Sequence, residues 1–189
     1  MRLVFNPFSS KLDWVTTPDA LISQVWNQTG STISKGKVIY LNGSHGNLPT
    51  IALAQANSEA TSSRTYGITQ YDIPNNSMGV VVHAGVIQGL DTQTIPVGVS
   101  LYLSPTVPGG ITTTKPQAPD HIVFLGMATR SHPTQGRIEV SIINGFELDE
   151  LHNVRIVSPQ DGQLLYYESS SSLWKNMDDK SLINALIFG

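Results

Sequence analysis

The sequence predicts an all-β protein, and three observations point to that class. Apolar and polar residues alternate along several short segments, which is the period of a strand with one buried face. Clusters of glycine, proline and asparagine separate these segments at short, regular spacing, as in β-barrels and β-sandwiches. Charged residues make up only 13% of the 189-residue chain, so neutral polar side chains must cover much of its surface. We therefore expect a compact β-barrel or sandwich domain with an extended N-terminal arm and a C-terminal hairpin region.

Residues 1–24 are expected to form the N-terminal arm, which serves attachment or trimer formation. This stretch carries aromatic and apolar side chains without a long hydrophobic period, and it has a turn signal at Asn6-Pro7. A short helical turn is predicted near its end, with Thr17 as N-cap and Pro18 at the first helical position. The residues expected to make the attachment contacts are Phe5, Pro7, Phe8, Leu12 and Trp14.

Residues 25–145 are expected to form the β-barrel or sandwich domain. Residues 78–90 are nearly all apolar, and glycines within them at Gly85 and Gly89 indicate bulges or bends. Alternation farther along the chain predicts an inward row of side chains at Ile138, Val140 and Ile142.

Two short runs of turn-forming residues within this domain predict tight turns. Asn42-Gly43 follows a short apolar run, and Pro108-Gly109-Gly110 lies in a long polar segment that reads as a loop or hairpin tip. The exposed loop at 105–120 is the part of the domain best placed to contact another molecule.

Residues 146–189 are expected to form a fibre-like hairpin followed by an apolar tail. One helical turn is predicted at Leu148 and Leu151, and a hairpin is predicted between a turn at Asp161-Gly162 and a serine tip at 169–172. A lone hairpin cannot bury both of its faces. Its partners are therefore the same hairpin of two sister chains or the β-domain of its own chain. The expected interface or packing residues are Leu164, Tyr166, Trp174, Leu182, Leu186 and Phe188.

Composition excludes several classes of function. A net charge of -3 gives no basic footprint for nucleic acid, and the absence of cysteine excludes disulfides, thiolate nucleophiles and zinc-thiolate sites. No apolar run approaches the roughly 20 residues of a membrane-spanning helix, so we expect no membrane insertion. The N-terminus lacks the apolar core of a signal peptide, and the sequons at Asn27 and Asn42 are interpreted as ordinary turn residues.

Candidate catalytic groups are scattered, and we expect no catalytic, cofactor or metal site. Ser44 adjoins His45, but side chains of adjacent residues point apart, whereas a nucleophile and its base must lie within about 3 Å. His83 lies in an apolar strand, where a buried hydrogen-bonded imidazole is expected. A meeting of His121 and His132 across neighbouring strands, with Asp120 beside them, is left open, as is an ion bound on a threefold axis, and neither has a sequence signal that supports it. The carboxylates flanking apolar strands, Asp72 and Asp91, are interpreted as structural turn residues.

Three stretches together resemble virion proteins of tailed bacteriophages, of the tail-fibre, neck-fibre or head-decoration kind. The first is "NPFSSKLDWV", which is similar to the entry segment of phage fibre proteins. The second begins "VWNQTGSTISKGKVIYLNG", with "SPTVPGGITTTKP" farther along, and resembles their small β-domain. The third, "DGQLLYYESSSSLWKN", resembles the end of a repeated fibre unit.

The resemblance implies a non-enzymatic homotrimer that assembles on the virion in the bacterial host cytoplasm. Its partners would be other virion proteins of the capsid, neck or tail, and a host surface glycan is a further partner to test. Because the fibre-like unit occurs once, we expect a short fibre, an adaptor or a decoration protein. The alternative is a carbohydrate-binding receptor-recognition module without a structural role. A hydrolase acting on a surface polymer has only the scattered acids and histidines in its favour.

Overall fold

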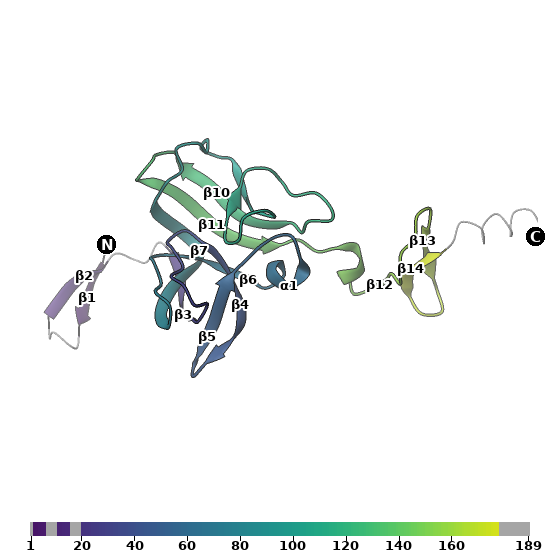
Figure 1. The fold of residues 1–189 in the computed structure, drawn as a ribbon, viewed down its shortest axis with the longest axis horizontal. Helices are drawn as coiled ribbons and strands as arrows, with labels where there is room; N and C mark the ends of the chain where they lie inside the picture. The colour runs from purple at the N-terminus through teal and green to yellow at the C-terminus, as the bar shows by residue number, and fades with distance from the viewer. Residues whose placement is uncertain (1, 7–10, 16–19, 178–189) are drawn as a thin grey trace, which may run out of the picture. The chain divides into compact units, whose positions relative to one another are not determined.

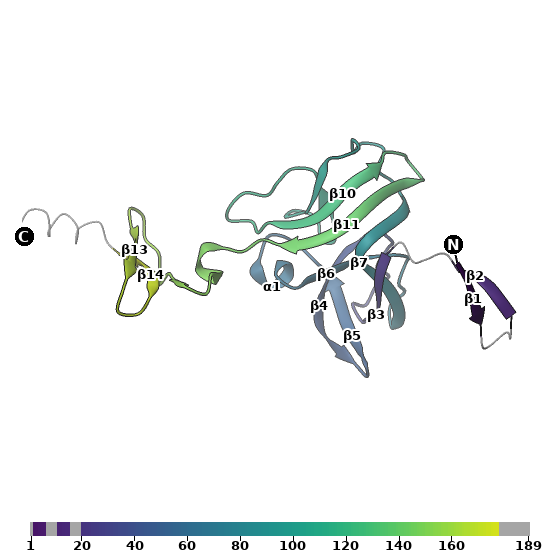
Figure 2. The ribbon, with the colours of Figure 1, turned by 180° about the vertical axis from the view of Figure 1, so that it is seen from behind.

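The structure is a computed structural model that describes the backbone at residues 2–6, 11–15 and 20–177 and the side chains at residues 20–177. Strands dominate it, as Figures 1 and 2 show from opposite sides. The chain divides into two compact units, Met1–Gly145 and Phe146–Gly189. The predicted all-β class is thus confirmed.

The body of the first unit, residues 20–145, contains one extended sheet. Its strand order is β3-β5-β4-β6-β7-β11-β10-β8-β9, and β3 also pairs with β7. Pairing therefore runs from β3 through β5, β4, β6 and β7 back to β3, which closes a five-stranded barrel; beyond β7 the sheet continues as β11, β10, β8 and β9. The strands are β3 (Ala20–Asn27), β4 (Val38–His45), β5 (Leu48–Leu53), β6 (Thr65–Thr69), β7 (Ser77–Leu90), β8 (Ser100–Leu103), β9 (Ile111–Thr112), β10 (Val123–Arg130) and β11 (Gly136–Asn144).

Strand β7 belongs to both parts of this sheet because it is fourteen residues long. Its first part pairs with β3 and β6, and its last part, from Ala84 to Leu90, pairs with β11. Gly89 is an extra residue between the pairs made by Gln88 and Leu90, and its φ of +75° is a conformation that glycine adopts without strain. The bulge predicted at Gly89 is confirmed, and Gly85 has a positive φ of +101° within the same strand.

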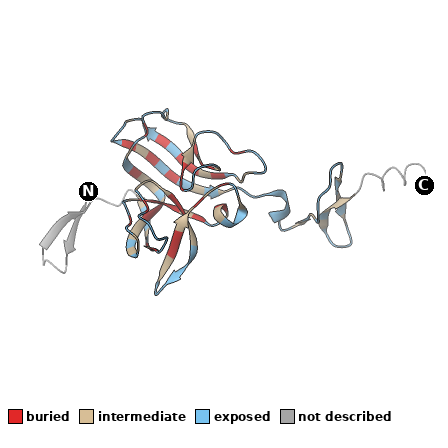
Figure 3. Cartoon of the chain, viewed as in Figure 1, coloured by how far each residue is buried: buried red, intermediate tan, exposed pale blue. Residues whose placement is uncertain are grey.

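Two apolar cores lie on the two faces of the barrel strands. Adjacent residues of one strand enter different cores: Val81 belongs to the cluster with Val25, whereas Val82 belongs to the cluster with Leu125. A strand covered on both faces has no polar alternation, which explains the nearly continuous apolar sequence of β7. Along β10 and β11 the buried residues alternate with more exposed ones (Figure 3). The inward positions predicted at Ile138 and Val140 are confirmed, and Ile142 packs against the same core while partly buried.

The first strand of the body begins earlier than the sequence indicates. Ala20 already lies in β3, five residues before the expected start at residue 25, and Ala20–Asn27 pairs with β7 along its whole length. The prediction of a helical turn is therefore wrong from Ala20 onward, because pairing with β7 outweighs the local N-cap signal; Thr17 and Pro18 lie outside the described residues.

The turn predicted at Asn42-Gly43 is also wrong. Both residues lie inside β4, where a register shift between Leu41 and Gly43 marks a bulge opposite β5. The chain reverses instead at Gly46, which has a φ of +57°. Asn42-Gly43 therefore forms a bulge within the strand and does not end it.

The N-terminal region contains an antiparallel pair of strands, β1 (Arg2–Asn6) and β2 (Lys11–Val15). In its register Phe5 lies opposite Leu12, and Leu3 lies opposite Trp14. Pro7 and Phe8 lie outside the described residues. The attachment role of this region stays a prediction.

Candidate functional site

The C-terminal unit contains a three-stranded sheet rather than an isolated hairpin. β13 (Leu164–Glu168) and β14 (Leu173–Met177) form the expected antiparallel hairpin, with turn residues at 169–172 between them. β12 (Val154–Arg155) adds a third strand, parallel to β14. Sequence analysis missed β12 because a two-residue strand has no periodicity to detect. The one-turn helix predicted near Leu148 and Leu151 is present as a 3-10 helix, η1 (Leu148–Glu150).

This unit has no buried residue among its described positions, 146–177, as Figure 3 shows by the absence of red. Phe146 is 80% exposed and Tyr167 is 50% exposed. Large apolar side chains are normally the most buried residues of a domain. Their exposure is unusual for side chains of this kind. The exposed large apolar residues are Phe146, Leu148, Leu151, Val157, Leu164, Leu165, Tyr167 and Trp174.

One face of the three-stranded sheet is apolar across all three strands. Trp174 in the central strand lies opposite Tyr167 on one side and opposite Val154 on the other. The rings of Tyr167 and Trp174 are tilted, with centroids 5.5 Å apart, a favourable distance for an aromatic pair. Leu165, two residues before Tyr167, lies on the same face. We call Val154, Leu165, Tyr167 and Trp174 the aromatic face.

The opposite face is mixed: it carries the charged residues Arg155, Glu168 and Lys175 beside Leu164, Tyr166, Leu173 and Met177. Tyr166 lies opposite Lys175, and Lys175 lies opposite Arg155. Leu164 shares the face of Tyr166. Tyr166 and Tyr167 point to opposite faces, and the register shows that Tyr167 is the one that meets the tryptophan. The role of Leu164, Tyr166 and Trp174 as interface residues stays a prediction.

An ion pair lies on this opposite face. Lys175 donates to the carboxylate of Glu168 across the hairpin, and the Ser171 hydroxyl donates to the same carboxylate. The hydrogen bond from Lys175, followed by that from Ser171, holds the pKa of Glu168 below its usual range. Lys175 and Ser171 both stabilise the ionised form of Glu168. Their bonds also fix the serine tip relative to the two strands.

Asn176 connects β14 to the segment that follows β12. Its side chain accepts from the backbone N–H of Val157 at 3.0 Å and donates to the Val157 carbonyl at 2.9 Å. It also donates to Gln163 at 2.6 Å. These contacts give a physical reason for the spacing of Gln163 and Asn176 in the third resembling stretch. A hollow of about 370 Å³ lies beside them, lined by Arg155, Val157, Gln163, Lys175, Asn176 and Met177.

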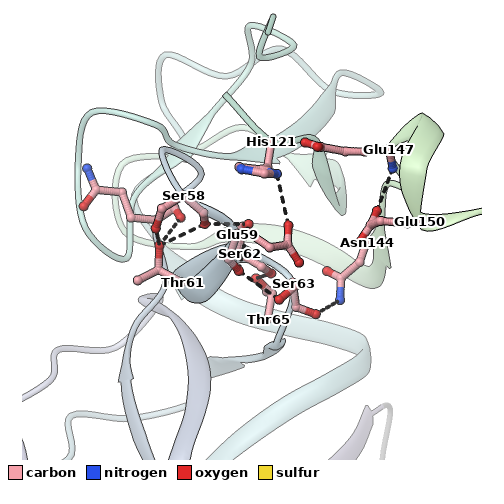
Figure 4. Close-up of polar contacts among 11 residues, drawn as sticks. Ser58, Glu59, Thr61, Ser62, Ser63, Thr65, His121, Asn144, Glu147 and Glu150 are labelled. Atoms are coloured by element: carbon pink, nitrogen blue, oxygen red, sulfur yellow. Dashed lines mark hydrogen bonds and ion pairs between the residues drawn. The ribbon is translucent and has the colours of Figure 1, made fainter. Parts of the chain in front are cut away.

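The histidines of the body do not gather into a site. His121 precedes β10 and His132 follows it. A strand of about 26 Å therefore separates them, and the meeting left open for the two does not occur. His121 pairs instead with Glu59 of the short helix α1 (Glu59–Ser62), with 3.2 Å between Nδ1 and Oε2 (Figure 4). The Nδ1 atom of His132 accepts the N–H groups of Thr134 and Gln135 and holds the turn between β10 and β11.

Hydroxyl groups gather around α1, and they bond to backbone carbonyls. Thr61 donates to the Gln55 carbonyl at 2.7 Å, and Ser62 donates to the Ser58 carbonyl at 2.8 Å. Figure 4 also shows Asn144 directed toward Ser63, whose carbonyl accepts its amide at 2.7 Å. These bonds hold the loop in place.

The remaining candidate catalytic residues have structural roles. Asp72 accepts the backbone N–H of Lys35 at 2.7 Å, and Asp91 accepts the N–H of Gln93 at 3.1 Å, so both carboxylates stabilise turns as expected. Ser44 and His45 are successive residues of β4, and the His45 ring stacks on Trp26 with centroids 4.4 Å apart.

His83 and the first sequon residue are held by their surroundings. His83 is half-buried, with Nδ1 2.7 Å from the Tyr66 carbonyl and the Tyr66 ring against its edge. Asn27 is fully buried, and its amide donates to the carbonyls of Ser31 and Ile73 while its oxygen accepts from Thr29. Asn27 therefore stabilises the fold and is closed to a modifying enzyme.

The loop expected to contact a glycan is docked on the barrel at its tip. Gly109 donates to the Ala54 carbonyl at 2.7 Å and accepts from Val38 at 3.1 Å. Gly109 and Gly110 are buried, whereas residues 113–115 and 117–119 are exposed. The predicted turn at Pro108-Gly109-Gly110 is thus part of the core packing.

The predicted tail residues Leu182, Leu186 and Phe188 lie outside the described residues. Within the part of the chain that the structure describes, no three His, Asp or Glu residues lie close enough to hold a metal ion. No helix among the described residues is long and apolar enough to cross a membrane. Comparison with protein-family models gives no matching family, and comparison with curated proteins gives no matching protein.

Proposed function

We propose that this chain is a non-enzymatic structural protein of a tailed-phage virion, a homotrimeric short fibre, adaptor or decoration protein. The observation that carries the proposal is the aromatic face on a unit whose described residues include no buried position. The phage assignment itself rests on the resemblance of the three sequence stretches. The body provides the folded domain, and the C-terminal unit provides the surface through which copies assemble.

Simple energetics favour an assembled state for the C-terminal unit. A three-stranded sheet of this size gains stability only when its apolar face is covered. Fully burying a side chain such as Leu165 contributes roughly 1.5–3 kcal/mol. Trp174 and Tyr167 offer large apolar areas that together form a continuous surface. Three copies around one axis would cover all three aromatic faces in a closed assembly.

The test replaces one residue of the aromatic face and measures the mass in solution. We expect the full chain to be a trimer by light scattering, and Trp174→Ala to weaken the trimer by about 2–4 kcal/mol per interface, as for a central aromatic contact. Tyr71→Ala removes an aromatic ring that is 61% exposed in the body, and this matched control should keep the trimer. A full-length chain that stays monomeric at tens of micromolar would end the proposal.

The virion assignment has its own test. An antibody against the body, or a tag added to the chain, should decorate purified phage particles at discrete positions in electron micrographs. If phage particles lack the protein in every preparation, the virion assignment is contradicted, whereas self-assembly of the chain is still tested by light scattering.

A further inference from the structure

A row of polar side chains crosses three neighbouring strands of the body. Arg137 on β11 lies in register with Gln88 on β7 and with Arg130 on β10. Register partners project from the same face of a sheet. The two guanidinium groups and the glutamine amide therefore lie on one surface, at the end of the sheet where β7 and β10 finish and β11 begins.

Bulges flank this row on both sides. Gly89 is the extra residue of β7 beside the Gln88 pair, and Thr129 is the extra residue of β10 beside the Arg130 pair. A bulge turns the neighbouring side chains away from the regular pleat, and bulges are common next to binding sites. Here the two bulges lie in β7 and β10, the strands on either side of Arg137.

An open hollow of about 280 Å³ lies at this place, lined by Gln88, Gly89, Arg130 and Gln135. The missing side chain of Gly89 leaves room for a third cation: a Cβ there would lie 2.9 Å from the Nζ atom of Lys35. Of its lining residues, Arg130 carries a positive charge, and Gln88 and Gln135 supply amide groups that donate and accept hydrogen bonds. Arg137, which is in register with Gln88 and Arg130, and Lys35, which lies near Gly89, are beside this lining.

The cation that lines this hollow and the two beside it are not neutralised by ion pairs within the described residues. Among the residues that the structure describes, Lys35, Arg130 and Arg137 form no ion pair. The Nε atom of Arg137 is buried without a hydrogen-bond partner, which costs free energy. Like charges directly opposite each other in a sheet also destabilise it. A bound anion would relieve both penalties.

We propose that this hollow binds an anionic oxygen group, a phosphate or a carboxylate, carried on a saccharide. Arginine recognises both groups through paired N–H donors, and Gln88 and Gln135 supply partners for sugar hydroxyls. The volume lies just below the range of ligand pockets, roughly 300–1,000 Å³, which suits one sugar ring rather than an extended chain. The site uses residues of the body alone and does not depend on the proposed assembly.

The test is titration of the full chain, with ¹⁵N-labelled arginine, by inorganic phosphate, glucuronate and neutral glucose at constant ionic strength. We expect saturable shifts of the Arg137 and Arg130 side-chain resonances with phosphate, glucuronate or both, and none with glucose or chloride. Whichever of phosphate and glucuronate causes the saturable shift is the kind of anionic group that the site binds. The absence of a saturable shift with both anions overturns the proposal.

Two variants assign the binding to this hollow. Arg130→Gln removes an exposed charge and should weaken binding at least tenfold, and Arg130→Glu should abolish it. Arg64→Gln removes another exposed arginine of the body and should bind like the parent chain. Thermal unfolding of each variant checks that it is folded. Equal loss of binding in Arg64→Gln, or full binding by folded Arg130→Glu, would contradict the assignment.

Discussion

The body and the C-terminal unit use the same element, the β-hairpin, with opposite results for burial. In the body, hairpins close into a barrel with a second apolar layer on its outside, and residues such as Ile39 and Val82 are fully buried. In the C-terminal unit, Trp174 remains 39% exposed although it lies in the central strand. The difference is the number of layers, because a single sheet has nothing to cover its apolar face. Folding buries the apolar side chains of the body, whereas it leaves those of the C-terminal unit exposed, which is the basis of the proposed assembly.

The largest expected effect that tests this comparison is in the body. Ile39→Ala should lower the free energy of unfolding by about 2–5 kcal/mol, because it opens a cavity in the barrel core. Ile143→Ala removes the same atoms from a side chain that is 59% exposed and should change stability by less than about 0.5 kcal/mol. Denaturant unfolding measures both, and equal effects would contradict the assignment of the core.

The smallest expected effect concerns the pH dependence of the C-terminal unit. The ordinary pKa of Glu168 is lowered in the folded sheet by Lys175 and Ser171. A carboxyl group with a lowered folded pKa stabilises the fold above its unfolded pKa, and this contribution is lost as the pH falls. Because the pair is near the surface, we expect a modest effect.

Amide hydrogen exchange of Tyr167 and Trp174, measured at neutral and at acidic pH, detects this effect. Protection should fall on acidification in the parent chain and should depend less on pH in Glu168→Gln. Identical pH profiles in the two chains would show that the Glu168–Lys175 pair does not stabilise the sheet.

Much of the fold follows from local sequence patterns, and the departures have a common cause. Alternation correctly places Ile138 and Val140 in the core, and the glycine signal correctly marks the bulge at Gly89. The helical turn predicted near Thr17 and Pro18 fails from Ala20 onward because β7 pairs with β3 there. The Asn42-Gly43 turn signal misleads because β4 continues past it and pairs with β5 as far as His45. Local preference yields to such tertiary pairing.

The candidate site was harder to predict than the fold. The sequence identifies Trp174 as a packing residue, but only the register distinguishes Tyr167, its neighbour, from Tyr166 on the other face. The row formed by Gln88, Arg137 and Arg130 also depends on pairing between strands that are distant in the sequence. Neither grouping has a signal within one segment, because both arise from which strands lie side by side.

Sedimentation of the full chain, compared with a chain that ends at Gly145, tests most directly whether the C-terminal unit assembles copies of the protein. We predict a trimer for the full chain and a folded monomer for residues 1–145, with a cooperative thermal transition in both. A shortened chain that still forms trimers would place the assembly surface in the first unit. A full chain that sediments as a monomer would contradict the assembly role of the aromatic face.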